Sequence, residues 1–144
     1  KEQYGGVEAT INSEMERINA TLYSEKANPP ILHLEGNSYE FFTQDDTGTG
    51  IAYKGLVVYD LAIASLTKLP ILVHDSLILK QISDEAVENI LARYMESGKQ
   101  VIISLDKQDS YSKRTAEILE KQCVLHLAPN GRELFGRAWS RQET

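Results

Sequence analysis

The N-terminal part of the chain carries apolar residues at the spacing of an amphipathic helix. Five of them recur every three or four positions, which places them on one helical face. They are Val7, Ile11, Met15, Ile18 and Leu22. The sequence Asn28-Pro29-Pro30 ends this segment, because proline cannot continue a helix. The pattern predicts a helix within residues 1–28, which either packs on its own domain or forms the last turns of a coiled coil.

A β-hairpin and a buried helix follow in the pattern. Residues 31–34 and 39–43 have strand character, and Gly36-Asn37-Ser38 between them is typical of a tight turn. A polar loop over residues 44–50 comes next. Residues 51–66 are apolar on nearly every face, which at this length favours a buried helix over a strand.

The remaining residues alternate between predicted strands and helices. Strands are expected at 71–73, 101–105, 124–127 and 134–139, and helices at 83–98 and 110–122, with a turn at Pro129-Asn130-Gly131. The uninterrupted apolar run 71–73 is typical of a sheet covered on both faces. The order of strand, helix and strand predicts right-handed crossovers. We therefore expect an α/β fold, with a mostly parallel sheet flanked by helices and a C-terminal hairpin, in a single domain over residues 29–144.

Composition places the chain among ordinary globular domains. Of its 144 residues, 42% are hydrophobic and 25% are charged, and the formal net charge of −6 disfavours a broad electrostatic grip on nucleic acid. The single cysteine, Cys123, excludes an internal disulfide and favours a reducing compartment, so we expect a cytoplasmic protein. The longest apolar stretch, 56–66, is interrupted by Asp60 and is short for a membrane span, so no membrane partner is expected.

Two aspartates stand where the predicted parallel strands end. Asp75 follows the first of these strands, and Asp106 follows the second. Ligands of open α/β sheets bind at this edge, and two carboxylates there would hold Mg²⁺ directly or through water. His74 and Ser76 flank Asp75, and the imidazole would reach a phosphate or a metal-bound water. The alternative for the aspartates is helix capping or exposure to solvent, and for His74 it is packing within the strand.

A second candidate site is Thr47-Gly48-Thr49-Gly50, at the start of the predicted buried helix. Glycines let a ligand approach the backbone, and threonine hydroxyls donate hydrogen bonds. The amides and the dipole of a helix N-terminus favour a phosphate. The same four residues also suit a loop that merely caps the helix, and the pattern does not decide between the two.

Taken in order, the hairpin, the glycine-threonine loop, the buried helix and the apolar strand ending in Asp75 resemble the C-terminal half of an ABC-type ATPase head. The closest class is the coiled-coil group of SMC, RecN and Rad-type repair proteins, and within it a bacterial domain of unknown function at the C-terminus of SMC-like proteins. The resemblance covers roughly residues 8–140. It implies a C-terminal lobe of the P-loop NTPase kind, excised from a longer chain whose Walker A half lies at the far end of a coiled coil.

The resemblance also assigns roles to individual residues. Thr47 to Gly50 stand at the Ser-Gly-Gly signature, which contacts the γ-phosphate of ATP bound by the opposite head. Asp75 stands at the Walker B aspartate, which organises the Mg²⁺ shell, and Asp106 stands near the switch histidine. Ser76 takes the place of the glutamate that polarises the attacking water.

The phosphate-binding motif G-x-x-x-x-G-K-[ST] does not occur in the sequence, so the chain should not hydrolyse ATP alone. The expected cofactors, ATP and Mg²⁺, would bind in the full-length protein. The expected partners are the N-terminal Walker A lobe of the same parent chain and a second head in a homodimer, and the resemblance further suggests DNA. Two other functions stay open: a degenerate head that acts as a protein-interaction module, and a stand-alone metal phosphohydrolase that uses Asp75, Asp106 and Asp109.

Overall fold

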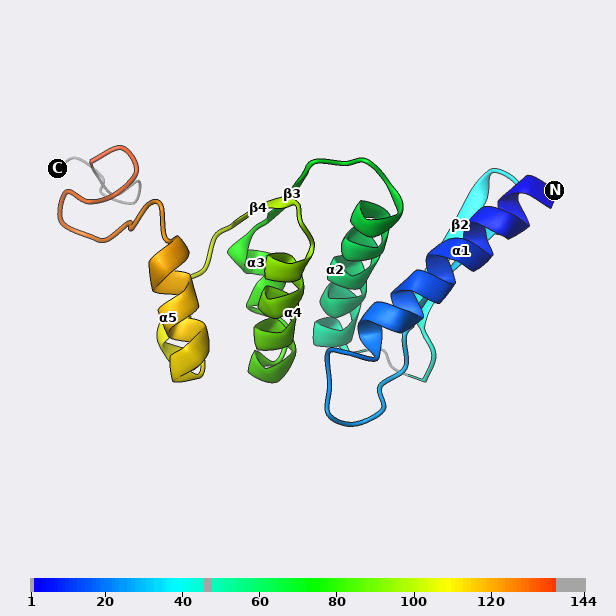
Figure 1. The fold of residues 1–144 in the computed structure, drawn as a ribbon, viewed down its shortest axis with the longest axis horizontal. Coiled ribbons are helices and arrows are strands. Elements are labelled where there is room, and N and C mark those ends of the chain that lie inside the picture. The colour runs from blue at the N-terminus through cyan, green and yellow to red at the C-terminus, as the bar shows by residue number, and fades with distance from the viewer. Residues whose placement is uncertain (1, 46–47, 137–144) are drawn as a thin grey trace, which may run out of the picture. The chain divides into compact units, whose positions relative to one another are not determined.

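The computed structural model describes the backbone of residues 2–45 and 48–136, and Figure 1 shows its ribbon. The chain forms two compact units, Lys1–Ser112 and Lys113–Thr144. In chain order the elements are α1 (Glu2–Asn19), β1 (Pro30–Glu35), β2 (Ser38–Thr43), α2 (Thr49–Leu66), β3 (Ile71–His74), α3 (Ser76–Leu79), α4 (Asp84–Glu96), β4 (Gln100–Ile103), the 3₁₀ turn η1 (Gln108–Ser110) and α5 (Lys113–Gln122). The expected α/β class is confirmed, but the described residues form two sheets of two strands each in place of one mostly parallel sheet.

The predicted hairpin is confirmed as β1 and β2, which pair antiparallel. Gly36 occupies the turn with a φ of 56°, a left-handed conformation that glycine adopts without steric cost. The hairpin lies against α2, where the ring of Phe41 meets Tyr59 edge-on at a centroid distance of 5.8 Å. A Cβ atom at Gly55 of α2 would lie 3.4 Å from the Phe41 ring, so the small residue lets hairpin and helix approach closely.

The side chains of α1 shield the outer edge of β1. Asn12 reproduces the pairing of a neighbouring strand: its Oδ1 accepts from the Leu32 amide and its Nδ2 donates to the Leu32 carbonyl, both at 2.8 Å. Glu8 accepts from the Leu34 amide at 2.7 Å, and this bond lowers the pKa of the Glu8 carboxyl. Open strand edges invite pairing with other chains. The helix therefore blocks the edge of β1 that β2 leaves free.

The apolar seam of α1 serves core packing over its C-terminal half. Met15 and Ile18 are buried, as is Leu22 just after the helix, whereas Val7 near the helix start is half exposed. The segment after α1 is held by α4, because the Asn89 side chain donates to the Leu22 carbonyl at 2.9 Å. The sequence predicts that this helix either packs on its own domain or forms the last turns of a coiled coil. The C-terminal turns of α1 pack on the domain.

The helix predicted over residues 51–66 is confirmed as α2, the central helix of the first unit (Figure 1). Val57, Val58 and Ala62 are fully buried. Lys54 is also fully buried, and its amine donates to Oδ1 of Asn19 at 2.9 Å and to the Asn28 carbonyl at 3.3 Å. These bonds offset the cost of removing the amine from water.

By length and composition alone, α2 is apolar enough to cross a membrane. The core helix of a soluble protein passes the same test, so the finding is weak support for a membrane span. In the structure α2 packs against α1, α3 and strands of both sheets.

β3 and β4 form a parallel pair, as the order of strand, helix and strand predicts. Leu72 and His74 are buried, whereas Ile71 and Val73 are exposed, Val73 to 66%. Ile102 of β4 lies opposite Val73 in the register and is also exposed. The expectation that this sheet is covered on both faces is therefore wrong for the described residues, because packing buries one face and leaves the other open.

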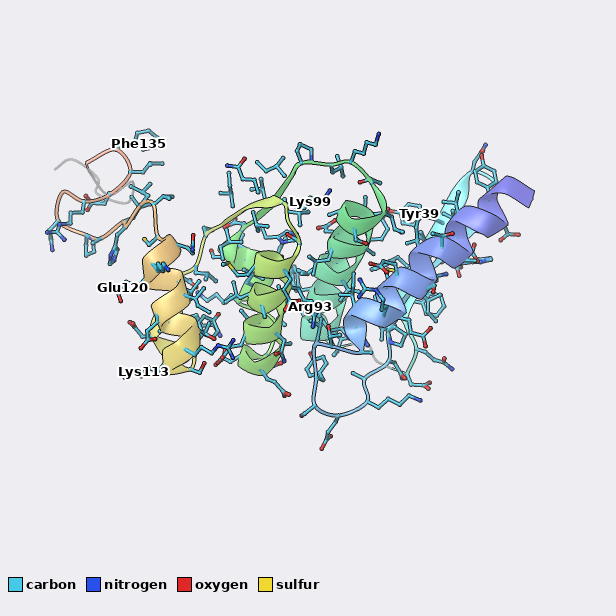
Figure 2. All side chains as sticks on the ribbon, viewed as in Figure 1. Tyr39, Arg93, Lys99, Lys113, Glu120 and Phe135 are labelled. Carbon is cyan, nitrogen blue, oxygen red and sulfur yellow. The ribbon has the colours of Figure 1, made fainter. Side chains whose placement is uncertain are left out.

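The helix predicted between these strands is confirmed as α4, and residues at both of its ends favour a helix start and a helix stop. The hydroxyl of Ser83 caps it by accepting from the Ala86 amide at 3.4 Å. Gly98, with a φ of 66°, follows the last turn. The next residue, Lys99, donates to the Thr67 carbonyl at 3.1 Å (Figure 2), which ties the start of β4 to the end of α2.

The second unit contains α5, which confirms the predicted helix but begins at Lys113. The predicted turn at Pro129-Asn130-Gly131 is present, with positive φ at Asn130 and Gly131. The prediction of a strand at 124–127 is wrong. The last strand is predicted at 134–139, and its described residues, 134–136, form no strand, whereas 137–139 lie outside the described residues. A strand needs a paired neighbour, and Val124 is 98% exposed, so this apolar run lies uncovered.

The substitution Lys54→Met should destabilise the first unit, although methionine keeps the length and apolar character of the lysine stem. The change leaves the buried Asn19 side chain without this donor, so we expect the free energy of unfolding to fall by about 2 kcal/mol. Urea unfolding followed by circular dichroism measures the change.

The matched control for this prediction is Lys68→Met, at an exposed lysine just beyond α2. It should alter the free energy of unfolding by less than about 0.5 kcal/mol. Equal stability of the two variants would show that the buried amine contributes nothing specific to the fold.

Candidate functional site

Asp75 stands directly after β3, at the carboxyl end of the parallel pair. Its side chain caps α3, with Oδ1 accepting from the Ser76 amide at 2.6 Å. The same oxygen accepts from the Ser104 hydroxyl at 2.7 Å. These bonds, the one from Ser104 first, hold the pKa of the Asp75 carboxyl below its ordinary value. An exposed carboxylate therefore stands at the end of β3, and it caps a helix, which is the alternative role that the sequence left open for it.

Ser104 is a site residue that the sequence reasoning missed. It follows β4, and its amide donates to the His74 carbonyl at 3.2 Å. Its hydroxyl oxygen lies within hydrogen-bond distance of Asp75 and also accepts from the Ser76 amide at 3.0 Å. The available signal was a polar residue at the end of the strand that pairs with β3. The prediction instead singled out Asp106, two residues further along.

The structure brings Asp106 to Lys80 and shows no contact between Asp106 and Asp75. Asp106 Oδ2 lies 2.7 Å from the Lys80 amine, which lowers the pKa of the Asp106 carboxyl. Within the described residues, no group of three or more histidine, cysteine, aspartate or glutamate side chains is arranged to hold a metal ion. A stand-alone metal phosphohydrolase built on Asp75, Asp106 and Asp109 therefore has no support in this part of the chain.

The glycine-threonine turn opens α2. Thr47 lies outside the described residues, Gly48 is the residue before the helix, and Thr49 and Gly50 are its first two residues. A Cβ atom at Gly50 would come within 2.6 Å of the Gln81 carbonyl oxygen. The segment after α3 approaches α2 so closely here that packing alone requires a glycine, and no ligand is needed to explain it. Gly48 and Thr49 are exposed, so a ligand can reach them.

His74 is 3% exposed and joins two helices to the end of β3. Its Nε2 lies 2.9 Å from Oδ2 of Asp60 on α2, and its Nδ1 lies 2.5 Å from the Tyr94 hydroxyl oxygen on α4. Burial first, and the Asp60 carboxylate second, raise the pKa of the Tyr94 phenol, so Tyr94 stays neutral. Both ring nitrogens have partners inside the fold, so a contact between His74 and a nucleotide would require these bonds to open.

A cavity of about 290 Å³ opens beside the start of α2. It is lined by Lys26, Ala27, Asn28, Thr43, Asp45, Ile51 and Lys54. The Lys54 amine in its wall already donates to Asn19 and to the Asn28 carbonyl, while Lys26 and Asp45 bring opposite charges. The lining therefore favours neither an anion nor a cation.

The donors present fit a magnesium ion only in part. Mg²⁺ in nucleotide sites usually keeps several waters and takes one or two carboxylates together with phosphate oxygens. Asp75 offers one such carboxylate, exposed and ionised. Ser76, which stands where the resemblance has a glutamate, directs its hydroxyl to Asp75 Oδ1 at 3.3 Å, so it serves the cap and provides no carboxylate base.

The substitution Ser104→Ala should raise the pKa of the Asp75 carboxyl toward its ordinary value, because the bond that most stabilises the ionised form is lost. The folded-state pKa of Asp75 lies below its unfolded value, so its contribution to stability is present above about pH 4 and is lost as the pH falls through the folded pKa. The variant should lose that contribution at a higher pH. An NMR titration of the side-chain carboxyl carbon measures the shift.

Ser110→Ala is the control for this titration, since the Ser110 hydroxyl donates to the Lys107 carbonyl and to neither oxygen of Asp75. Its Asp75 pKa should match that of the unmodified chain. The same Asp75 pKa in both variants would mean that the strand-end hydroxyl does not set the charge of the site.

Comparison with known proteins matches the chain to a family model. A family model described as "Uncharacterised protein conserved in bacteria (DUF2326)" matches residues 16–139. No curated protein matches the chain. The match confirms the coarser part of the resemblance, a bacterial domain of unknown function, and its description contains no reference to ATPase heads.

Proposed function

Since the chain belongs to this family of uncharacterised bacterial proteins, we propose a function from its own residues: it is a non-autonomous C-terminal lobe of an SMC-like ATPase head. In this proposal Asp75 serves the Mg²⁺ of an ATP site in its own head. The turn formed by Thr47, Gly48, Thr49 and Gly50 serves the ATP held by the opposite head.

The observation that carries the proposal is the setting of Asp75. A parallel strand delivers the carboxylate to the edge of the sheet where α/β proteins bind ligands. Ser104, just after the neighbouring strand, binds one carboxylate oxygen and lowers the pKa of the carboxyl. Phosphoryl transfer depends on positioning and on neutralising charge, and a fixed, ionised carboxylate meets the first of these needs.

Each residue has a limited task in this mechanism. The Asp75 carboxylate would hold the metal or its waters, and the bound Mg²⁺ would neutralise charge on the phosphates. The amides at the start of α2 and the Thr49 hydroxyl would donate to a terminal phosphate. Ser76 cannot polarise water as a carboxylate does, so water activation would fall to another group or proceed slowly.

The open face of the β3–β4 sheet supports a lobe that is completed by a partner. Ile71, Val73 and Ile102 are exposed side by side on this face. Parallel sheets are stable where both faces are covered. With no phosphate-binding loop in the sequence, the proposed partner is the Walker A lobe of the same parent protein. A head-to-head homodimer and DNA remain proposed partners on the strength of the resemblance.

The substitution Asp75→Ser in the natural full-length protein tests the proposal. Serine is a good helix cap, so the variant should keep the start of α3 and a melting temperature near that of the unmodified protein. It lacks the carboxylate, so we expect Mg²⁺-dependent ATP turnover to fall at least about 100-fold, which corresponds to about 2.7 kcal/mol of transition-state stabilisation. A coupled phosphate-release assay measures turnover.

Glu40→Gln, which removes an exposed charge from β2, is the control and should leave turnover unchanged. If Asp75→Ser also hydrolyses ATP within about twofold of the unmodified protein, Asp75 has no role in the reaction and the assignment fails.

A degenerate head that acts as an interaction module is the second candidate. Two observations favour it: Ser76 in place of a glutamate and the exposed apolar face of β3 and β4. In this case the full-length protein should not bind ATP in a calorimetric titration with Mg²⁺. Saturable, Mg²⁺-dependent binding would instead favour the ATPase head.

A further inference from the structure

We propose that Asp60 and His74 form a clamp that fixes Asp75 relative to the Gly48–Gly50 turn, which makes both of them positioning residues for the ATP site. This inference rests on the proposed function and adds residues to it. Neither side chain is expected to touch ATP. Their effect passes through the backbone of β3 to Asp75 and through α2 to the turn.

The first anchor of the clamp is the buried imidazole at the end of β3. His74 immediately precedes Asp75, and its ring bonds to side chains of both α2 and α4. The bond to Asp60 attaches the strand end to the middle of α2, and the bond to Tyr94 attaches it to α4. With both ring nitrogens engaged, the imidazole cannot rotate without breaking a buried hydrogen bond.

The second anchor lies at the start of α2. The segment that follows α3 returns to this helix, and the Gln81 carbonyl approaches Gly50 so closely that no side chain fits between them. Asp60 and Gly50 are ten residues apart on one helix, which is about 15 Å along its axis. The segment from His74 to Gln81 therefore contacts α2 twice, at Asp60 through His74 and at Gly50 through Gln81. Together with residues 50–60 of α2 it forms a closed ring of contacts, and Asp75 lies within that ring.

The strand that ends just before Asp75 depends on such side-chain anchors, because the sheet around it is small. β3 has one hydrogen-bonded neighbour among the described residues, and an isolated pair of strands is marginally stable. Reactive groups that shift by about 1 Å lose about 100-fold in rate. Opening the ring would let Asp75 and the turn move independently, although each would remain present.

The substitution Asp60→Ala tests the clamp and is preferable to a change at His74, because Asp60 is 44% exposed and its loss is less disruptive to the core. Asp60→Asn is the conservative variant, since its amide oxygen can still accept from Nε2 of His74. Ser65→Ala is the matched control: the Ser65 hydroxyl on the same helix contacts Glu14 of α1 and not β3.

The first measurement is a distance distribution between two nitroxide labels in the natural full-length protein. The labels replace Thr49 in the turn and Leu77, which is exposed two residues after Asp75, and Cys123 is changed to serine so that it takes no label. We expect a narrow distribution in the unmodified protein, in Asp60→Asn and in Ser65→Ala, and a broad one in Asp60→Ala. An equally narrow distribution in Asp60→Ala overturns the clamp.

The second measurement is ATP turnover by the unlabelled proteins. Asp60→Ala should lose at least about tenfold in kcat with KM for ATP within about threefold, and Asp60→Asn should recover most of the loss. A broad distance distribution with unchanged kcat overturns the positioning role. Absence of turnover in the unmodified protein overturns the proposed function, while the label distances still decide whether the clamp exists.

Discussion

The first unit depends on how α2 satisfies its two charged residues. This apolar helix contains one lysine and one acid, Lys54 and Asp60. Lys54 is bonded to the end of α1 and the segment after it, and Asp60 is bonded to β3. Apolar packing has no preferred direction, whereas a buried polar group without a partner costs about 1–3 kcal/mol. The buried Lys54 and the buried His74, which Asp60 binds, therefore fix how α2 is rotated and which segments lie on each side of it.

The β3–β4 sheet has only two strands among the described residues, so ladder hydrogen bonds alone stabilise it weakly. Where more strands would provide ladder hydrogen bonds, side chains take over: His74 ties the pair to α2 and α4, Ser104 crosses from β4 to Asp75, and Lys99 ties the start of β4 to Thr67. The uncovered face with Val73 and its neighbours remains apolar. A lobe that is completed by a partner would leave such a face exposed, and so would an interaction module.

The elements that depend on local signals were predictable from the sequence. The hairpin turn at Gly36 and the end of α4 at Gly98 follow from the left-handed conformation that glycine adopts. The start of α4 follows from the hydroxyl of Ser83, which caps the helix. The strands predicted after α5 failed because an apolar run such as the one at Val124 becomes a strand only beside another strand. Pairing is decided by the tertiary fold, and local composition does not contain it.

The residues of the candidate site also differ in whether local sequence or the tertiary fold determines their role. Asp75 was predictable, because its place at the end of an apolar strand is a local property. Its partner Ser104 was not, since the sequence does not show which of the polar residues after β4 points back toward β3. Asp106 carries the more conspicuous charge, yet it pairs with Lys80. His74 was found for its position, but its partner Asp60 is fourteen residues away on another element.

Helix capping alone does not account for the environment of Asp75. A cap requires a side-chain oxygen that accepts from amides of the first turn, and the bond to Ser76 meets that requirement. The hydroxyl of Ser104, just after β4, also accepts from the Ser76 amide and so shares the cap. Its own bond to Asp75 serves no cap, and that bond is the largest cause of the lowered pKa of Asp75. For Gly50, in contrast, a structural reason is sufficient: the Gln81 carbonyl lies too close to leave room for a side chain. The ligand hypothesis therefore draws its support from the carboxylate and Ser104 rather than from the glycine pattern that suggested a phosphate site.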